Sequence, residues 1–333
     1  MKEAIIWVDT PYLGNKIFSE GDPYLNRDDC LRPYIELKNE LKLNSIDLKT
    51  QDLRITDPEF IIFNDMSPLN VLKSLNGIKK FLIIFESEII KPQNWNLKLH
   101  KYFEKIFTWN DDFIDNKKYF KINFANNFIF PESFKSFSDR SIFSLIIAGN
   151  KMVIHEKELY SERLKTIRWF EKNSRDDFKL FGMGWDMVTF KGFARPLNRI
   201  PGLRKFLGKN KFPSYCGTVD SKFETLSNAK FSICYENAKD ITGYITEKIF
   251  DCFFAGCIPV YWGISNPSDV FGDGTFIDRR KFNSHEDLLN YLKNISEEEY
   301  TEIQENILKF CFNEKNGKFS NNFFVKQISE QII

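Results

Sequence analysis

The stretch that determines the fold class runs from Lys230 to Gly263 and reads KFSICYENAKDITGYITEKIFDCFFAGCIPVYWG. It contains an apolar run at Phe231–Tyr235, a polar loop, a helix expected over Glu247–Ala255 and a second apolar run at Ile258–Tyr261. Short apolar runs that alternate with helices are typical of buried parallel strands. The stretch therefore predicts a strand–loop–helix–strand unit of an α/β fold.

Similar apolar runs occur on both sides of a polar stretch at 126–141, where we place a domain boundary. Helices are expected between them, at Arg32–Leu43 and His155–Asn173. We predict an α/β domain over 1–135, a second one over 140–300, and packing helices over 301–333. Ligands of open parallel sheets bind beyond the carboxyl ends of the strands, so the expected site lies between the domains. The predicted strands are Ile5–Val8, Phe60–Phe63, Phe81–Phe85 and Ile106–Trp109 in the first domain, and Ser144–Ala148, Phe178–Phe181, Phe231–Tyr235 and Ile258–Tyr261 in the second.

The overall charge excludes some classes of partner. Forty-seven basic residues almost balance 46 acidic ones, so the chain lacks the strong positive field of a nucleic-acid-binding protein. An anionic ligand must therefore be held by local charges. The three histidines are scattered and form no HxH or HExxH motif, so we expect no metal site.

The sequence also gives expectations about location. The first apolar run, near the N-terminus, is too short for a signal peptide, and no later run reaches the about 20 residues of a membrane span. The six cysteines form no CxxC pair and no regular disulfide framework, which favours a reducing compartment. We expect a cytoplasmic protein, either free or peripheral at the inner face of the membrane.

The polar loop leads into a helix start suited to an anion. Thr246 is a good N-cap, and the first turn of a helix presents unpaired backbone N–H groups and a partial positive charge. Lys248 adds a full charge there, and Glu247 can accept hydrogen bonds from ribose or sugar hydroxyls. The spacing alone is equally compatible with an ordinary capped helix carrying solvated charges.

Three segments of this stretch resemble the signature of the α-1,3/1,4-fucosyltransferase family. They are FSICYEN at 231–237, GYITEKI at 243–249 and AGCIPVYWG at 255–263, in the family's order and at nearly its spacing. The resemblance implies a GT-B fold, in which two Rossmann-like domains face a cleft. It also implies inverting transfer of L-fucose from GDP-fucose to a hydroxyl of a glycan acceptor, by a bacterial-type enzyme without a membrane anchor.

The same resemblance implies a set of donor-binding residues in the second domain. The segment Ala148–Asn150 followed by Arg163 is similar to a family strand, asparagine and downstream arginine that contacts the donor phosphate. Arg163 can alternatively be a residue of a helix surface. Glu236 is interpreted as either a structural or a donor-site carboxylate. The implied donor-binding residues are Arg163, Glu236, Asn237, Tyr244, Glu247 and Lys248.

A candidate base lies in the first domain. Phe85-Glu86-Ser87 and the later segment 107–112 resemble the acceptor-side motif of the family, in which a glutamate precedes a serine and a proline. Inversion in one displacement needs a base near the attacking hydroxyl and charge stabilisation of the departing diphosphate. We assign the base to Glu86, with a solvated strand-end glutamate as the alternative. Glu88 stands where the proline is usual and is the second candidate.

A basic stretch at 186–218 departs from the family. It is either a solvated loop or a cationic patch that holds an acidic glycan or a lipid-linked acceptor at an anionic membrane surface. Its basic residues are Lys191, Arg195, Arg199, Arg204, Lys205, Lys209 and Lys211.

The expected partners follow from these interpretations. They are GDP-fucose as the donor substrate and a glycan acceptor, either an oligosaccharide or a lipid-linked saccharide. We expect no tightly bound cofactor, no requirement for a divalent metal and no nucleic acid. Two alternatives remain open: a GT-B glycosyltransferase with another nucleotide-sugar donor, and a non-catalytic glycan-binding relative.

Overall fold

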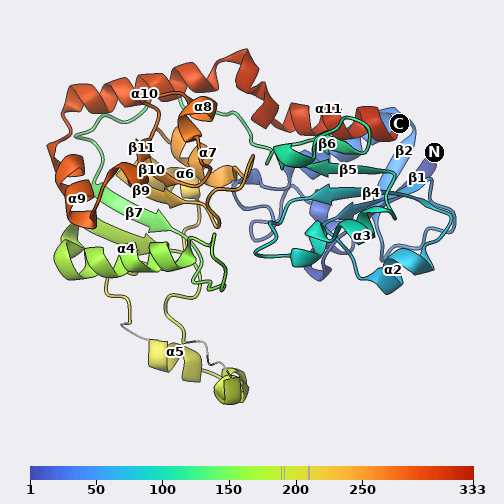
Figure 1. Ribbon diagram of the computed structural model, residues 1–333, viewed down its shortest axis with the longest axis horizontal. Coiled ribbons are helices and arrows are strands. Elements are labelled where there is room, and N and C mark those ends of the chain that lie inside the picture. The colour runs from blue at the N-terminus through green and yellow to red at the C-terminus, as the bar shows by residue number, and fades with distance from the viewer. Residues whose placement is uncertain (189, 191, 209–210) are drawn as a thin grey trace.

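The computed structural model describes residues 1–188, 190, 192–208 and 211–333 (Figure 1). The described chain forms two α/β units, each built on a parallel sheet. The first sheet has the strand order β2-β1-β3-β4-β5-β6, and all of its paired strands are parallel. Its strands are β1 (Lys2–Trp7), β2 (Ile46–Thr50), β3 (Phe60–Asn64), β4 (Lys79–Ile84), β5 (Lys105–Thr108) and β6 (Tyr119–Lys121).

The second sheet has the order β11-β10-β9-β7-β8 and is also parallel. The signature stretch supplies its two central neighbours, β9 and β10, and the helix between them. These strands are nearly continuous apolar runs because helices cover both faces of the sheet. The strands are β7 (Ile142–Ile147), β8 (Phe178–Phe181), β9 (Ala229–Tyr235), β10 (Ile258–Trp262) and β11 (Ile277–Asp278).

The helices follow the alternation expected of such sheets. In the first unit they are α1 (Arg32–Leu43), α2 (Leu69–Ser74) and α3 (Leu97–His100). The remaining helices are α4 (Tyr160–Asn173), α5 (Leu203–Gly208), α6 (Lys222–Ser227), α7 (Glu247–Phe254), α8 (Pro267–Phe271), α9 (His285–Asn294), α10 (Glu297–Cys311) and α11 (Asn321–Ile332).

Each strand predicted from an apolar run is present, with its ends no more than three residues from the expected ones, whereas β2, β6 and β11 were not predicted. β2 reads IDLKT and buries alternate residues, Ile46, Leu48 and Thr50, so its apolar signal is half that of a buried strand. β6 and β11 have three and two residues. Such short edge strands owe their structure to a neighbouring strand and leave almost no pattern in the sequence.

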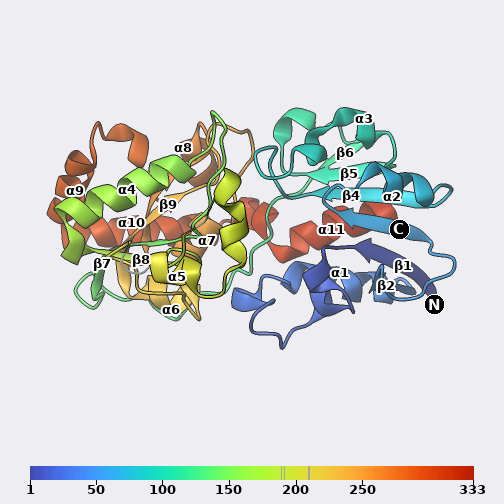
Figure 2. The ribbon, with the colours of Figure 1, turned by 90° about the horizontal axis from the view of Figure 1, so that it is seen from below.

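The C-terminal tail is divided between the two units. α10 buries Tyr300, Ile303 and Ile307 in the core of the second unit. α11 runs back to the first unit, where Phe324 and Ile328 pack with residues of α1 in its core. Figure 2 shows this return, and Figure 1 shows both chain ends in the first unit. The expected group of packing helices over 301–333 is therefore shared between both cores.

The two connections between the units lie side by side. Asn126 donates its backbone N–H to the Phe319 carbonyl at 2.8 Å and accepts from the Asn321 N–H at 3.2 Å. Asn126 and Ser320 thus form a parallel bridge outside the two sheets. The segment that leaves the first unit and the segment that returns to it are therefore paired at Asn126 and Ser320.

None of the helices in the described ranges has both the length and the apolar character that crossing a membrane requires.

Candidate functional site

Two cavities lie between the two units at the carboxyl ends of the strands. The first has a volume of about 300 Å³ and is lined mainly by the second unit, whereas the second, of about 940 Å³, is lined by both units. Both cavities are therefore parts of one cleft. The residues that line both are Arg27, Met183, Val219, Lys222, Glu247 and Asp251.

The lining of the first cavity is positively charged. It includes five cationic side chains and two carboxylates. Such a wall suits an anion with several charges, held by fixed groups. The cations are Arg27, Lys151, Arg163, Lys222 and Lys248, and the carboxylates are Glu247 and Asp251.

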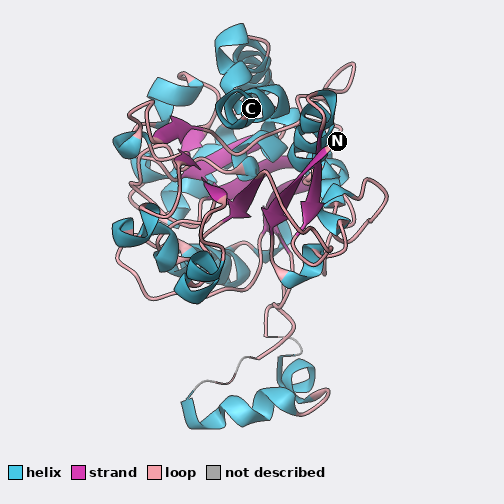
Figure 3. Cartoon of the chain, turned by 90° about the vertical axis from the view of Figure 1, so that its right-hand side faces the viewer, coloured by secondary structure: helices cyan, strands magenta, loops and turns pink. Residues whose placement is uncertain are grey.

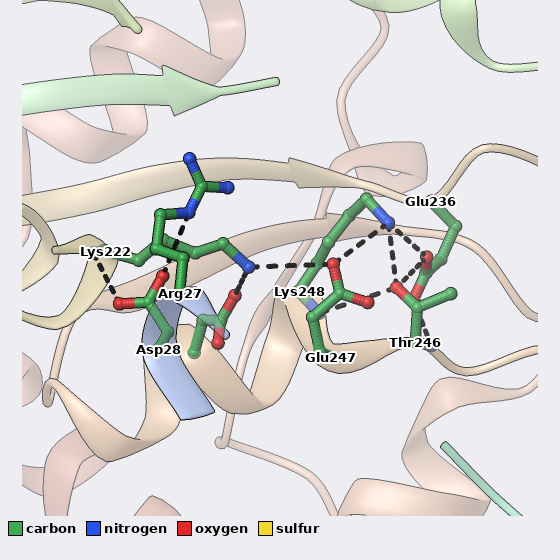
Figure 4. Close-up of polar contacts among 8 residues, drawn as sticks. Arg27, Asp28, Lys222, Glu236, Thr246, Glu247 and Lys248 are labelled. Carbon is green, nitrogen blue, oxygen red and sulfur yellow. Dashed lines mark hydrogen bonds and ion pairs between the residues drawn. The ribbon is translucent and has the colours of Figure 1, made fainter. Parts of the chain in front are cut away.

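The start of α7 is held by a buried carboxylate. Glu236 follows β9, has no exposed surface, and accepts from the Thr246 backbone N–H at 2.9 Å and from its hydroxyl at 2.7 Å. Thr246 caps α7, as predicted, by accepting from the Lys248 N–H. Lys248 Nζ donates to Thr246 Oγ1 at 2.9 Å and lies 3.5 Å from Glu236 Oε2 (Figure 4). Glu236 does not line either cavity, so this geometry favours its structural interpretation.

Alternating charges continue from this point along the cavity wall. Lys248 Nζ is 3.8 Å from Glu247 Oε1, which is also 3.8 Å from Lys222 Nζ, and Lys222 Nζ is 2.7 Å from Asp251 Oδ2. We call Glu236, Lys248, Glu247, Lys222 and Asp251 the charge chain, and Figure 4 labels the first four of these. Each lysine is fixed between carboxylates and so has little freedom to move when a ligand binds.

The charge chain determines the protonation of its members. Burial alone would raise the pKa of Glu247, but Lys248 and Lys222 lower it overall. Glu247 is therefore an ionised hydrogen-bond acceptor. Burial raises the pKa of Glu236 against the opposing effect of Lys248.

The first unit touches the charge chain through one loop. Asp28 Oδ1 accepts from the Lys222 backbone N–H at 3.0 Å, and Arg27 Nε lies 3.5 Å from Asp28 Oδ2. Asp28 has a φ of 55°, a left-handed conformation that is costly for a residue with a side chain. This contact could not be predicted, because Arg27, Asp28 and Lys222 belong to no recognisable motif.

Arg163 of α4 is buried, which excludes its alternative interpretation as a helix-surface residue. Its Nη2 donates to the Tyr235 carbonyl at 2.8 Å and to the Glu236 carbonyl at 3.3 Å, at the end of β9. Arg163 and Lys248 line the same cavity. The charges that the sequence assigned to a departing diphosphate are thus brought together.

Tyr160 is a cavity residue that the sequence analysis missed. Its ring lies 5.3 Å from the Arg163 guanidinium carbon, and its hydroxyl is buried without a hydrogen-bond partner among the described residues. Burial raises the pKa of Tyr160; Arg163 and Lys248 oppose this, and Glu86 adds to it. An unpaired buried hydroxyl is costly, and a ligand in the cavity could satisfy it. Only its position one turn before Arg163 could have indicated it.

The other predicted donor residues are placed differently. Asn237 lines the first cavity, together with Glu247 and Lys248. Tyr244 lines neither cavity and is 2% exposed. Its ring packs 4.8 Å from that of Trp109 in the first unit. This position favours a role in joining the units over a direct donor contact.

Glu86 lies just beyond the carboxyl end of β4, in the first unit. Its N–H donates to Asp65 Oδ1 at 3.2 Å, and its carbonyl accepts from Asn94 Nδ2 at 3.0 Å and Trp95 Nε1 at 3.1 Å. Hydrogen bonds on both sides therefore fix this peptide. Within the described part of the chain, nothing donates a hydrogen bond to the Glu86 carboxylate, and the residue is half-buried.

The surroundings of Glu86 shift its titration. Burial, and then Asp65, raise the pKa of Glu86, whereas Lys151 and Lys248 lower it. Both lysines line the first cavity from the second unit, so the Glu86 carboxylate experiences charges across the cleft. Glu86 itself is not a lining residue of either cavity, although Phe85 lines the second.

Glu88, the second candidate base, is exposed, and its carboxylate lies 4.0 Å from His155 Nε2. Glu86, in contrast, is half-buried. The geometry therefore favours Glu86.

No group of three or more His, Cys, Asp or Glu side chains in the described ranges is arranged to hold a metal ion.

Comparison with known proteins places the signature stretch in a family. Residues 208–305 match the family described as Glycosyltransferase family 10 (fucosyltransferase) C-term. The chain contains a family 10 fucosyltransferase domain. The resemblance seen in the sequence is therefore confirmed.

Two curated relatives match part of the chain. The α-(1,3)-fucosyltransferase FucT of Helicobacter pylori is 37% identical over 75 residues, which are 22% of this chain and 16% of that protein. The α-(1,4)-fucosyltransferase of Arabidopsis thaliana is 28% identical over 120 residues, or 34% of this chain and 29% of that protein. The matches thus span less than a third of either relative.

Solved structures with low sequence identity share the whole fold. A crystal structure of an α1,3-fucosyltransferase superposes with a TM-score of 0.55 at 14% identity, covering 99% of this chain and 90% of that one. An α-glucosyltransferase in complex with UDP gives 0.56 at 12% identity, covering 100% and 99%. The expected GT-B fold of two Rossmann-like units is therefore confirmed.

Proposed function

We propose that this chain transfers L-fucose from GDP-fucose to a hydroxyl of a glycan acceptor, with inversion at the sugar carbon. The observation that carries the proposal is the set of five cations that line the first cavity, of which Lys151 and Lys248 of the second unit also lower the pKa of the half-buried Glu86 of the first unit. The family 10 domain supports fucose as the sugar. One of the solved structures with this fold, at a TM-score of 0.50, is described as an α1,3-fucosyltransferase with GDP-fucose.

The donor diphosphate binds in the first cavity. Arg163 and Lys248 line it, and the backbone N–H groups at the start of α7 add partial positive charge. As the bond between the fucose carbon and the diphosphate oxygen breaks, negative charge grows on that oxygen, and these fixed cations stabilise it. Ion pairs hold Lys248, and hydrogen bonds to backbone carbonyls hold Arg163, in place before the donor arrives.

The acceptor reacts on the opposite face of the sugar. Its hydroxyl oxygen forms the new bond to the fucose carbon while Glu86 accepts the proton. A raised pKa makes this carboxylate a stronger base near neutral pH. The anionic Glu247 accepts hydrogen bonds from donor hydroxyls, and Asn237 supplies a neutral contact in the same cavity.

Donor titration tests the proposal directly. Calorimetry should give a GDP affinity at least tenfold higher than that for UDP, and incubation with GDP-fucose and a glycan array should give fucosylated products. The anomeric configuration of the product, determined by NMR, should be opposite to that of the donor. Equal affinities for the two diphosphates would favour another donor, and GDP binding without transfer to any acceptor would favour the non-catalytic alternative.

The biological setting is part of the same proposal. A cytoplasmic enzyme of this kind would modify an oligosaccharide or a lipid-linked saccharide during synthesis of cell-surface polysaccharide or lipopolysaccharide. Five cationic side chains line the first cavity and can neutralise a diphosphate, so we expect transfer to persist in EDTA. Loss of transfer in EDTA and its recovery with Mg²⁺ or Mn²⁺ would contradict this expectation.

A further inference from the structure

A basic, apolar segment stands away from both units. It comprises the 3-10 helix at 192–199 and α5, and we call residues 192–208 the arm. Figures 1 and 3 show the arm extended from the second unit, away from both sheets. A segment held outside the cores contributes little to folding and presents its side chains to a partner.

The charge of this region is opposite to that of the rest of the chain. Between Asp186 and Asp220 the sequence has seven basic residues and no acidic one, whereas the remainder has 40 basic and 46 acidic residues. Lys191 and Lys209 lie outside the described residues. Arg199 and Lys205 of the arm are exposed. The positive charge is thus concentrated on a projection from a body with an acidic excess.

Large apolar side chains are exposed beside these charges. Phe206 is 75% exposed and Leu207 49%, and both follow Lys205 directly on α5. Ile200 is 46% exposed. Adjacent apolar side chains exposed on one projection indicate a site of interaction.

The arm is hydrogen bonded at its base to Val188. The Val188 N–H donates to the Arg204 carbonyl at 2.9 Å, and Arg204 Nε donates to the Val188 carbonyl at 3.0 Å. Met183 lies nine residues before the arm and Val219 eleven residues after it, and both of these residues line both cavities. The two connections to the arm therefore start from residues of the cleft.

We propose that the arm docks on the surface of an anionic lipid bilayer. Lipid phosphates and carboxylates would bind Arg199 and Lys205, while Phe206 and Leu207 enter the boundary between headgroups and acyl chains. An acidic glycan would bind the basic side chains of the arm but leave its apolar side chains in water. A bilayer matches both, and it would bring a lipid-linked acceptor to the cleft.

Vesicle binding by the full chain tests the inference without any donor, so the result does not depend on the proposed transfer. Sedimentation with vesicles of phosphatidylcholine and 30% phosphatidylglycerol should give strong, salt-sensitive binding, and pure phosphatidylcholine should give little. Arg199→Glu with Lys205→Glu should weaken binding on the order of thirtyfold, since each basic residue near such a surface contributes about fivefold. Phe206→Ser with Leu207→Ser should weaken it about tenfold.

A matched control uses the same charge change elsewhere. Lys309→Glu with Lys326→Glu alters two exposed lysines on α10 and α11 and should leave vesicle binding within about twofold of the parent. Equal loss in this control would overturn the proposal in favour of a general charge effect. Equal binding of the parent chain to neutral and anionic vesicles would also overturn it. So would tight binding to a soluble acidic polysaccharide with no binding to vesicles. Unchanged thermal unfolding of the arm variants would show that they fold.

Discussion

The two walls of the cleft are built on different principles. On the second-unit wall every member of the charge chain has an oppositely charged neighbour within 4 Å. On the first-unit wall the backbone of Glu86 is fixed, but within the described residues its carboxylate accepts no hydrogen bond. Paired charges hold a ligand in a constant position, whereas an unpaired, half-buried carboxylate is ready to take a proton. The second-unit wall is therefore suited to binding the donor, and the first-unit wall is suited to accepting a proton.

We expect the largest loss of activity from a substitution of Glu86. Glu86→Gln keeps the shape of the side chain but removes its basicity, so kcat should fall about 10²–10⁴-fold. GDP affinity, measured by calorimetry, should stay within about twofold of the parent value. Glu88→Gln is the control and should keep parental turnover. A fall in kcat for Glu88→Gln and none for Glu86→Gln would transfer the base to Glu88.

The charge chain should also contribute to the stability of the fold. Glu236→Ala leaves the Thr246 N–H without its acceptor and the partly buried Lys248 without one partner. Removing one member of a buried ion pair typically costs about 3–5 kcal/mol of folding free energy, so the melting temperature should drop by several degrees or more. Urea unfolding gives the free energy. A variant as stable as the parent would show that the charge chain contributes nothing to folding.

Substitution of Tyr160, which lines the first cavity, should change donor affinity without changing stability. The Tyr160 hydroxyl has no described partner in the free protein, so Tyr160→Phe should not lower the melting temperature. If the hydroxyl binds the donor, affinity for GDP-fucose should drop about five- to tenfold. Reduced stability with unchanged donor affinity would indicate instead that the hydroxyl is bonded in the free protein.

The pH dependence of activity should follow the titration of Glu86. Activity needs the Glu86 carboxylate, so kcat/KM should decrease as the pH falls through the raised pKa of Glu86. Lys151 lowers this pKa, so Lys151→Met should raise it and move the acidic limb of the profile to higher pH. Asp65 raises it, so Asp65→Asn should move the limb to lower pH. Limbs that stay in place in both variants would exclude Glu86 as the titrating group.

Much of the fold and part of the site could be predicted from the sequence. The signature stretch predicted the helix cap at Thr246 and the position of β9 and β10, because these follow from local pattern. The contact of Asp28 with Lys222 could not be predicted, since it joins residues 194 positions apart and uses a left-handed backbone conformation. The position of Tyr244 differs for a similar reason: its partner Trp109 belongs to the other unit, and only the packing of the two units fixes that contact.

The bridge between Asn126 and Ser320 affects how the cleft can open. Because the outgoing and the returning segment are hydrogen bonded to each other there, one unit cannot swivel freely about a single flexible connection. Both segments must bend together, so the cleft can open only by a hinge motion at Asn126 and Ser320. A proteolytic cut between α10 and α11 would release this constraint and also strip a covering helix from the first sheet, so C-terminal truncation should damage the N-terminal half of the molecule.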